Sequence, residues 1–278
     1  MNKTIVLILL STLIIAQETT SIDTTWQKEL VGSFSFNQAY FDNWIAGGEN
    51  ALAHQFDLVG KLIYSNEKYV WTNTGKIAFG NSKIGEAETK KTIDELRIES
   101  LLTYFIGFAA DPYLALKGET QLAPGYIYGE DLNIQVSGFL DPGYFTQSAG
   151  LQYSPNKELS VRFGFAVKET VTKDFPDPYT DDSGTEEIET TKIEPGLESV
   201  LTFSKKISES TLLNSKIDLF NNFTELDATD IRWDTDITAQ VTKYINVKFN
   251  VKLFYDKDIS PKRQISQSLL LGISYTIL

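Results

Sequence analysis

The sequence contains no cysteine and only one histidine, His54. The absence of cysteine excludes disulfide bridges, thiolate metal ligands and a lipid-modified cysteine anchor, because each of these needs the sulfur atom. Acidic residues outnumber basic ones, and the formal net charge is −12. This charge disfavours nucleic acid as a partner, since its phosphates are themselves negative. We therefore expect no nucleic-acid partner and no cofactor.

Long apolar runs are also scarce, because Thr4–Ile15 is the only one. It follows Lys3 and precedes Ala16, and this layout predicts a signal peptide at 1–16. The alternative, a transmembrane anchor, fits less well because a spanning helix needs about 20 apolar residues. Any membrane contact made by 17–278 must therefore come from strands rather than helices.

The remainder of the chain alternates apolar and polar residues with a period of two, which is the pattern of β-strands. Within 245–256, one face carries Val247, Phe249, Val251, Leu253 and Tyr255, and the other carries Lys248, Asn250, Lys252 and Asp256. The same reading predicts twelve strands, at 28–38, 52–64, 69–80, 93–106, 113–122, 144–153, 158–170, 195–206, 211–222, 230–242, 245–256 and 266–278.

Short and long connections alternate between these predicted strands. Outer-membrane barrels show this asymmetry, with short periplasmic turns and longer external loops. We therefore predict an all-β fold, a closed antiparallel up-and-down transmembrane β-barrel of about 12 strands that occupies 17–278. Both termini are expected in the periplasm. Outer-membrane lipid and, during insertion, the barrel-assembly machinery are the expected partners, and the oligomeric state is left open.

The strands of a soluble barrel would show the same alternation of apolar and polar residues. The positions of the aromatic residues are therefore used to distinguish a soluble barrel from a membrane barrel. One set lies beside the predicted tight turns and a second near the opposite strand ends, as in the interfacial girdles of membrane barrels. The first set includes Tyr64, Tyr69, Trp71, Tyr104, Tyr153 and Tyr244, and the second includes Trp44, Phe145, Phe220, Phe223, Trp233 and Phe254. This distribution favours a bacterial outer-membrane location.

The segment Asn43–Asn50, with the pattern N-W-x-x-G-G-E-N, resembles an uncharacterised family of Bacteroidota outer-membrane proteins that is classed as a domain of unknown function. Further matching segments are Leu122–Tyr126, Pro142–Tyr144, Lys216–Asn222 and Leu253–Asp258. The resemblance implies an outer-membrane barrel. It implies no catalytic residues.

The polar faces of the strands supply the first candidate site. Their charges have mixed signs and are expected in the lumen, where they either form ion pairs that fill the interior or line a polar pathway that selects a solute. The acids are Glu95, Glu99, Glu119, Asp218, Asp234 and Asp236, and the bases are Arg97, Lys117, Arg162, Lys168, Arg232, Lys248 and Lys252.

The first long loop supplies a second candidate. Asn43, Glu49 and Asn50 could line an entrance or bind a ligand, and the simpler interpretation is a shaped turn built on Gly47 and Gly48. A third candidate is the loop that carries Asp174, Asp177, Asp181, Asp182, Glu186 and Glu187. It could bind calcium through oxygen atoms, but it lacks the ordered spacing of a calcium-binding loop.

His54 has no G-x-S-x-G partner motif, so we interpret it as an interfacial residue and expect no enzyme. Two functions remain open. The protein is either a narrow channel or binding protein for small polar solutes, or a closed barrel that acts as a structural or accessory envelope component through its external loops.

Overall fold

The fold is taken from a computed structural model, which describes residues 25–278 except 44, 130–131, 178, 182–186 and 226–228. The predicted signal peptide at 1–16 lies outside the described residues. The same holds for Trp44 of the loop motif and for Asp182 and Glu186 of the acidic loop.

Period-two alternation is the dominant feature of the described chain, and strands form where it occurs. The fourteen strands are β1 (Thr25–Ala39), β2 (Ala51–Ser65), β3 (Tyr69–Ile84), β4 (Lys90–Tyr104), β5 (Asp111–Thr120), β6 (Gly125–Tyr128), β7 (Asn133–Ser137), β8 (Gly143–Tyr153), β9 (Leu159–Val171), β10 (Thr191–Ser208), β11 (Thr211–Asn222), β12 (Thr229–Gln240), β13 (Ile245–Tyr255) and β14 (Gln264–Thr276). No helix in the described part of the chain is long and apolar enough to cross a membrane.

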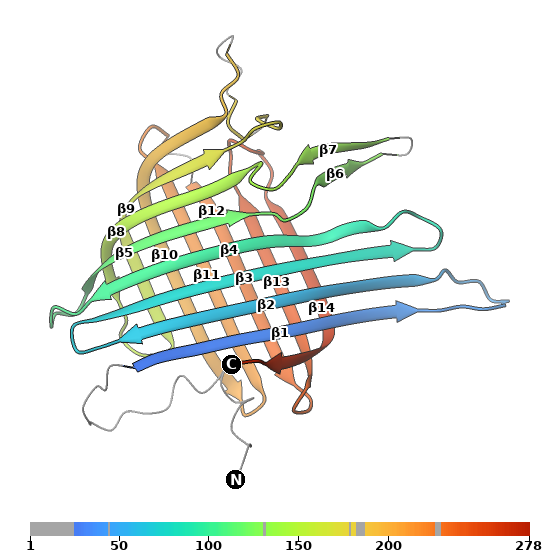
Figure 1. Cartoon of the computed structure of the whole chain (residues 1–278), viewed down its shortest axis with the longest axis horizontal. Coiled ribbons are helices and arrows are strands. Elements are labelled where there is room, and N and C mark those ends of the chain that lie inside the picture. Colours follow the sequence, from blue (N-terminus) through green and yellow to red (C-terminus); the bar gives the residue numbers. More distant parts are fainter. Residues whose placement is uncertain (1–24, 44, 130–131, 178, 182–186, 226–228) are drawn as a thin grey trace.

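Twelve of these strands form one closed antiparallel barrel (Figure 1). Each strand pairs with its neighbour along the chain, except that β5 pairs directly with β8. The seam pairs β1 with β14, from Val31 opposite Thr276 to Ser35 opposite Gly272. The fold class and all twelve predicted strands are confirmed.

The two ends of the barrel differ. The turn end carries the connections 66–68, 105–110, 154–158, 209–210 and 241–244, and the loop end carries the other six. One of these six, predicted at 81–92, is mostly strand, because β3 runs to Ile84 and β4 starts at Lys90. This extension is polar, so the alternation that predicts membrane-spanning strands does not mark it.

The strands β6 and β7 form a separate hairpin within the loop predicted at 123–143. It is tied to β4, because the Lys91 amide donates to Tyr128 Oη at 3.1 Å. The connection before β4 also holds it, since Asn133 Nδ2 donates to Glu88 at 2.7 Å. The sequence prediction missed this hairpin because its strands are far shorter than a barrel strand.

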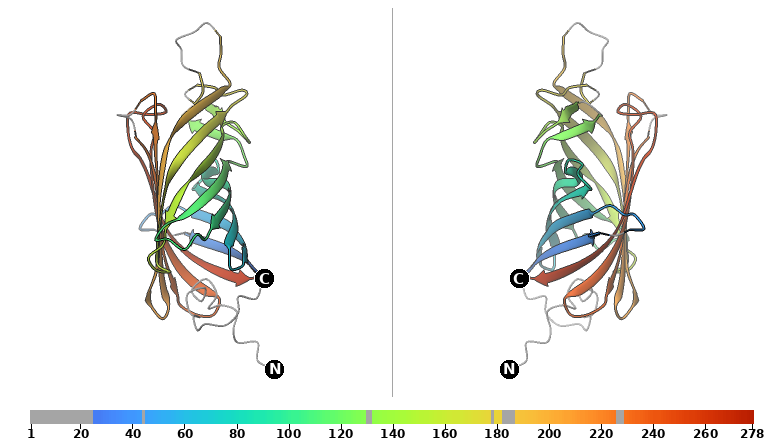
Figure 2. Two further views of the ribbon diagram at one scale, coloured as in Figure 1. Left: turned by 90° about the vertical axis from the view of Figure 1, so that its left-hand side faces the viewer. Right: turned by 90° about the vertical axis from the view of Figure 1, so that its right-hand side faces the viewer.

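The barrel has two facing walls, and Figures 1 and 2 show the strands β1–β5 crossing the strands β10–β14 at a steep angle. This arrangement places the inner faces of β4 and β5 opposite those of β11, β12 and β13. Side chains that are remote in sequence can therefore meet across the lumen.

The outer face of the barrel is largely apolar, and the inner face is largely polar or small apart from a few apolar side chains such as Phe220 and Phe254. Large apolar side chains such as Phe165 and Leu269 expose 69% and 68% of their surface on the outside. On the inside, Glu95, Ser148 and Arg162 are buried. This is the reverse of a soluble barrel, whose core is apolar.

An aromatic cluster lies at the turn end. The ring of Trp26 lies 5.2 Å from that of Tyr64 and 6.1 Å from that of Trp71, and Tyr64 also contacts Tyr69. The sequence prediction was wrong for Phe220 and Phe254, which it placed in the second outer band. Both share the strand face of lumen charges and line the interior.

Candidate functional site

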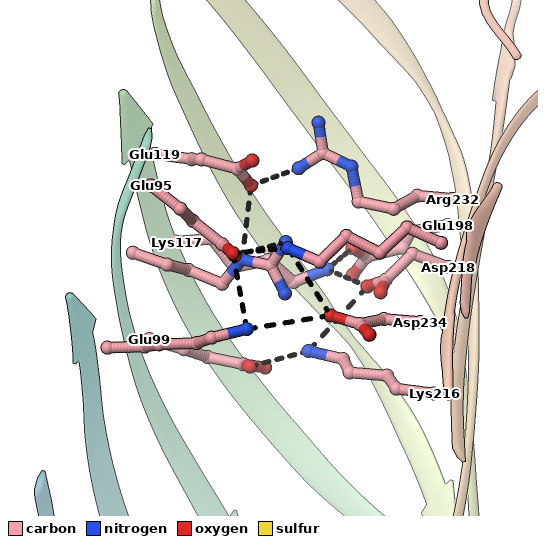
Figure 3. Close-up of polar contacts among 12 residues, drawn as sticks. Glu95, Glu99, Lys117, Glu119, Glu198, Lys216, Asp218, Arg232 and Asp234 are labelled. Atoms are coloured by element: carbon pink, nitrogen blue, oxygen red, sulfur yellow. Dashed lines mark hydrogen bonds and ion pairs between the residues drawn. The ribbon is translucent and has the colours of Figure 1, made fainter. Parts of the chain in front are cut away.

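Charged side chains from opposite walls meet across the lumen (Figure 3). We call this group the ion-pair layer. Because side chains alternate along a strand, every second residue of β4, β5, β11, β12 and β13 points inward. Its members are Lys76, Glu95, Arg97, Glu99, Lys117, Glu119, Arg162, Glu198, Lys216, Asp218, Arg232, Asp234 and Lys252.

One half of the layer centres on Glu95 and Glu119. Glu95 accepts a hydrogen bond from Lys252 of β13 at 2.5 Å and lies 3.2 Å from Lys76 of β3. Glu119 accepts from Arg97 at 3.2 Å and also pairs with Arg232 of β12. These contacts join the wall of β3–β5 to the wall of β12–β13.

The other half centres on Glu99 and Lys117. Glu99 accepts from Arg162 of β9 at 2.6 Å and from Lys216 of β11 at 2.7 Å. Lys117 donates to Asp218 of β11 at 2.7 Å and also pairs with Glu198 of β10. The layer thus spans the lumen from β4 and β5 to β9, β10 and β11.

The pairing in the layer follows from its burial. The side chains of Arg162, Glu198 and Glu95 expose only 5%, 4% and 6% of their surface. An unpaired charge at such depth is strongly unfavourable, so each is matched by opposite charges. The layer therefore places paired side chains across the lumen, from one wall to the other.

A second group of charges lies nearer the loop end, and we call it the loop-end cluster. Lys168 of β9 lies 3.0 Å from Glu194, 2.5 Å from Asp230 and 3.4 Å from Asp256. Lys192 lies 3.3 Å from Glu194 and also pairs with Asp258. Four carboxylates thus surround two lysines.

Cavities lie on both sides of the layer. The loop-side cavity, of about 120 Å³, lies between the layer and the loop-end cluster and is also lined by Tyr144, Phe220 and Phe254. A neighbouring space of about 180 Å³ reaches Asp94 and Asp234. The turn-side cavity, of about 110 Å³, is lined by residues of β1 and β10–β14.

Small residues on the inner face of β8–β10 make room for two aromatic rings. A Cβ atom on Gly196 would lie 2.7 Å from the ring of Phe220, and one on Gly164 would lie 2.8 Å from Tyr113 Oη. Tyr113 and Phe220 are both buried. The two rings therefore pack against this wall on the two sides of Lys117 and Glu198.

The structure brings most of the predicted lumen residues together. Ten of the thirteen belong to the ion-pair layer, namely Glu95, Arg97, Glu99, Lys117, Glu119, Arg162, Asp218, Arg232, Asp234 and Lys252. Lys248 instead pairs with Asp236 at 3.2 Å on neighbouring strands of one wall. Of the two interpretations of these charges, the geometry favours ion pairs that fill the interior.

The loop residues Asn43, Glu49 and Asn50 line none of the three cavities described above. Asn50 Oδ1 accepts a hydrogen bond from the Phe41 amide at 2.7 Å, and the Asn50 carbonyl accepts one from the Gly85 amide at 2.7 Å. Asn43 has a φ of 52°. These contacts shape the loop and tie it to the connection between β3 and β4.

The sequence prediction missed several charges that the structure places in the lumen. They are Lys76, Lys192, Glu194, Glu198, Asp230 and Asp258. Strand parity could have identified some of them, because Glu194 and Glu198 share a face with Gly196 and Val200 on β10. Asp258 lies beyond β13, where parity gives no guidance.

The remaining candidates lie apart from the layer. His54 stacks on Phe34, with ring centroids 6.4 Å apart, and it lines none of the three cavities. Among the described residues, no group of three or more His, Cys, Asp or Glu side chains is placed to hold a metal ion.

The connection after β9 is held by one buried carboxylate. Asp141 accepts hydrogen bonds from the amides of Lys173 at 3.0 Å, Asp174 at 2.7 Å and Phe175 at 3.4 Å. Burial raises the pKa of Tyr179 in the same connection, and the negative charge of Asp141 raises it further. The Asp141 carboxylate is therefore a structural anchor for the connection between β9 and β10.

Comparison with known structures gives weak likenesses to outer-membrane barrels. The translocator domain of the autotransporter NalP from Neisseria meningitidis is 11% identical, with a TM-score of 0.41 over 91% of this chain and 89% of that one. An outer-membrane channel from Pseudomonas putida F1 is 13% identical, with a TM-score of 0.40 over 93% and 96%. The NanC porin is 9% identical, with a TM-score of 0.41 over 89% and 98%.

Comparison by sequence gives one family. No curated protein matches the chain. Residues 36–126 match the model of a family described as a protein of unknown function, DUF3078, and this range includes the loop motif Asn43–Asn50. The Bacteroidota origin that the resemblance suggests stays a prediction.

Proposed function

We propose that this protein is a closed outer-membrane barrel, an accessory or binding component of the envelope rather than an open channel. The observation that carries the proposal is the ion-pair layer, which joins opposite walls of the lumen. Small polar solutes would enter the loop-side cavity and stop at the layer.

The apolar outer face supports the membrane location. In lipid, every backbone polar group must find its partner within the protein, and only helices and closed barrels achieve this. The seam between β1 and β14 removes the free strand edges. By analogy with other outer-membrane barrels, the loop end would face the outside of the cell.

Planar-bilayer conductance of the refolded protein tests the closed state. The wild-type protein is expected to give no stable ion conductance. A variant that removes four crossing charges without changing the net charge, E95A/E119A/R232A/K252A, is expected to conduct. The matched control D236A/K248A removes a pair that lies on one wall only, and it is expected to remain closed.

A gated narrow channel is the second candidate, and the cavities on both sides of the layer favour it. In this candidate, a rearrangement of the layer would join the cavities into one path. Brief, voltage-dependent openings of the wild-type protein would support this candidate over the closed barrel. A steady open conductance of the wild-type protein would contradict both.

A further inference from the structure

The loop-side cavity carries an excess of negative charge. Its lining contains six acids and five bases, namely Glu99, Glu119, Glu198, Asp218, Asp230 and Asp256 against Arg97, Lys117, Lys168, Lys216 and Arg232. Of the charges that contact this lining from outside, Glu95 and Glu194 are acids and Arg162 is a base, so the excess of acids remains. The ion pairs thus leave a negative potential that attracts positively charged groups.

Glu198, which lines this cavity, has a carboxylate oxygen without a hydrogen-bond partner. Glu198 exposes 4% of its side chain, and its Oε1 is paired with Lys117. Its Oε2 is buried and has no hydrogen-bond partner among the described residues. A buried acceptor without a donor is unfavourable, so a donor supplied by a ligand would be stabilising here. Arg162 also has an unpaired nitrogen, but Arg162 does not line this cavity.

The apolar part of the lining also suits a cation. The Lys168 ammonium lies 5.2 Å from the centre of the Phe220 ring, and the Arg232 guanidinium lies 5.1 Å from that of Phe254. Aromatic faces attract positive charge, and their hydrocarbon surface can pack against an alkyl chain. Both rings also line the cavity, so the ring surface that Lys168 and Arg232 leave uncovered can pack against the stem of a small amine.

We propose that the loop-side cavity binds a small organic cation, a primary amine on a short alkyl stem. The ammonium group donates to Glu198 Oε2 and to the Asp230 carboxylate, and the stem packs against Phe220 and Phe254. The proposal rests on the closed barrel proposed above, because the ion-pair layer is the floor of the cavity.

Isothermal titration calorimetry of the refolded protein in detergent tests this, with three probes of equal length but different charge. Pentylamine is expected to bind with a Kd below about 1 mM at low salt. Neutral pentan-1-ol and anionic pentanoate are expected to give only the heat seen with empty micelles. Equal binding of pentanoate and pentylamine would overturn the proposal.

Three variants locate the site. Both E198Q and D230N keep the side-chain shape while removing one negative charge, and each is expected to weaken pentylamine binding about tenfold or more. D236N makes the same change outside the cavity and is expected to bind like the wild type. Resistance of the barrel to SDS before heating shows that each variant is folded.

Unchanged affinity in both E198Q and D230N would place the amine elsewhere and refute the site. Conductance of the wild-type protein would refute the closed barrel by a separate readout, whatever the titration gives. The failure of this inference and that of the proposed function are therefore distinguishable.

Discussion

Gly164 of β9 illustrates how closely strands β8 and β9 approach each other. A Cβ atom on Gly164 would press against the carbonyl oxygen of Ala149 and lie 2.8 Å from Tyr113 Oη. We expect Gly164→Ala to lower the free energy of unfolding by about 1–3 kcal/mol, because a backbone oxygen cannot move away as a flexible side chain can. Urea unfolding in detergent micelles measures the change.

The matched control is Gly75→Ala on β3, where a Cβ atom would meet nothing within 4 Å. This variant is expected to be neutral or slightly stabilising, because alanine restricts the unfolded chain more than glycine does. Equal stability of the two variants would show that the contact at Gly164 is relieved by a small shift of the strands.

At the scale of residues, parity along each strand was enough to assign most lumen charges from sequence. Arg97, Lys117 and Asp218 all lie where the alternation puts them. The same rule applied strictly would have corrected Phe220, which is two residues from Asp218 and therefore on the inner face. The sequence suggests an outer position for Phe220 only because an aromatic residue near a strand end resembles a girdle residue.

Among the connecting elements, the segment between β9 and β10 depends on Asp141. The Asp141 carboxylate accepts three backbone hydrogen bonds and is 5% exposed. We expect Asp141→Ala to speed proteolytic cleavage within 172–190 about tenfold or more, since hydrogen bonds to a charged group contribute about 1.5–3 kcal/mol each. The barrel strands should stay protected.

Asp174→Ala is the control for this loop. The side chain of Asp174 is 65% exposed and pairs with the exposed Lys173 at 3.6 Å, so its removal is expected to leave the cleavage rate nearly unchanged. Limited proteolysis followed by mass spectrometry gives both rates. Equal cleavage of the two variants would show that Asp141 does not anchor the loop.

The strands of the barrel wall were predictable from the sequence, and the elements beyond the wall were not. Spanning strands must place apolar residues outward at every second position, so the lipid imposes a visible pattern. The hairpin β6–β7 and the polar ends of β3 and β4 meet no such demand. They are held instead by particular contacts, such as that of Tyr128 with the Lys91 amide.

For the molecule as a whole, the sequence predicted a charged lumen but not which charges meet. Which charges meet depends on the angle at which the two walls of the barrel cross. This crossing angle is a property of the closed barrel and not of any single strand. Glu95 and Lys252 are 157 residues apart, and Glu99 and Lys216 are 117 apart. No local pattern connects such pairs.

These sequence separations have a kinetic consequence for the barrel. Hairpins form from neighbouring segments, whereas contacts of long sequence separation form late because they must first close a long loop. Crossing pairs should therefore be absent from the folding transition state. Removing one should leave the folding rate into micelles nearly unchanged and speed unfolding.

E95A/K252A tests this against D236A/K248A, whose partners lie on the adjacent strands β12 and β13. Stopped-flow dilution into and out of urea gives the two rates, and slower folding of E95A/K252A with unchanged unfolding would contradict the expectation. If instead only unfolding becomes faster, the charges that cross the lumen set the lifetime of the folded barrel, because they slow its unfolding without affecting its formation.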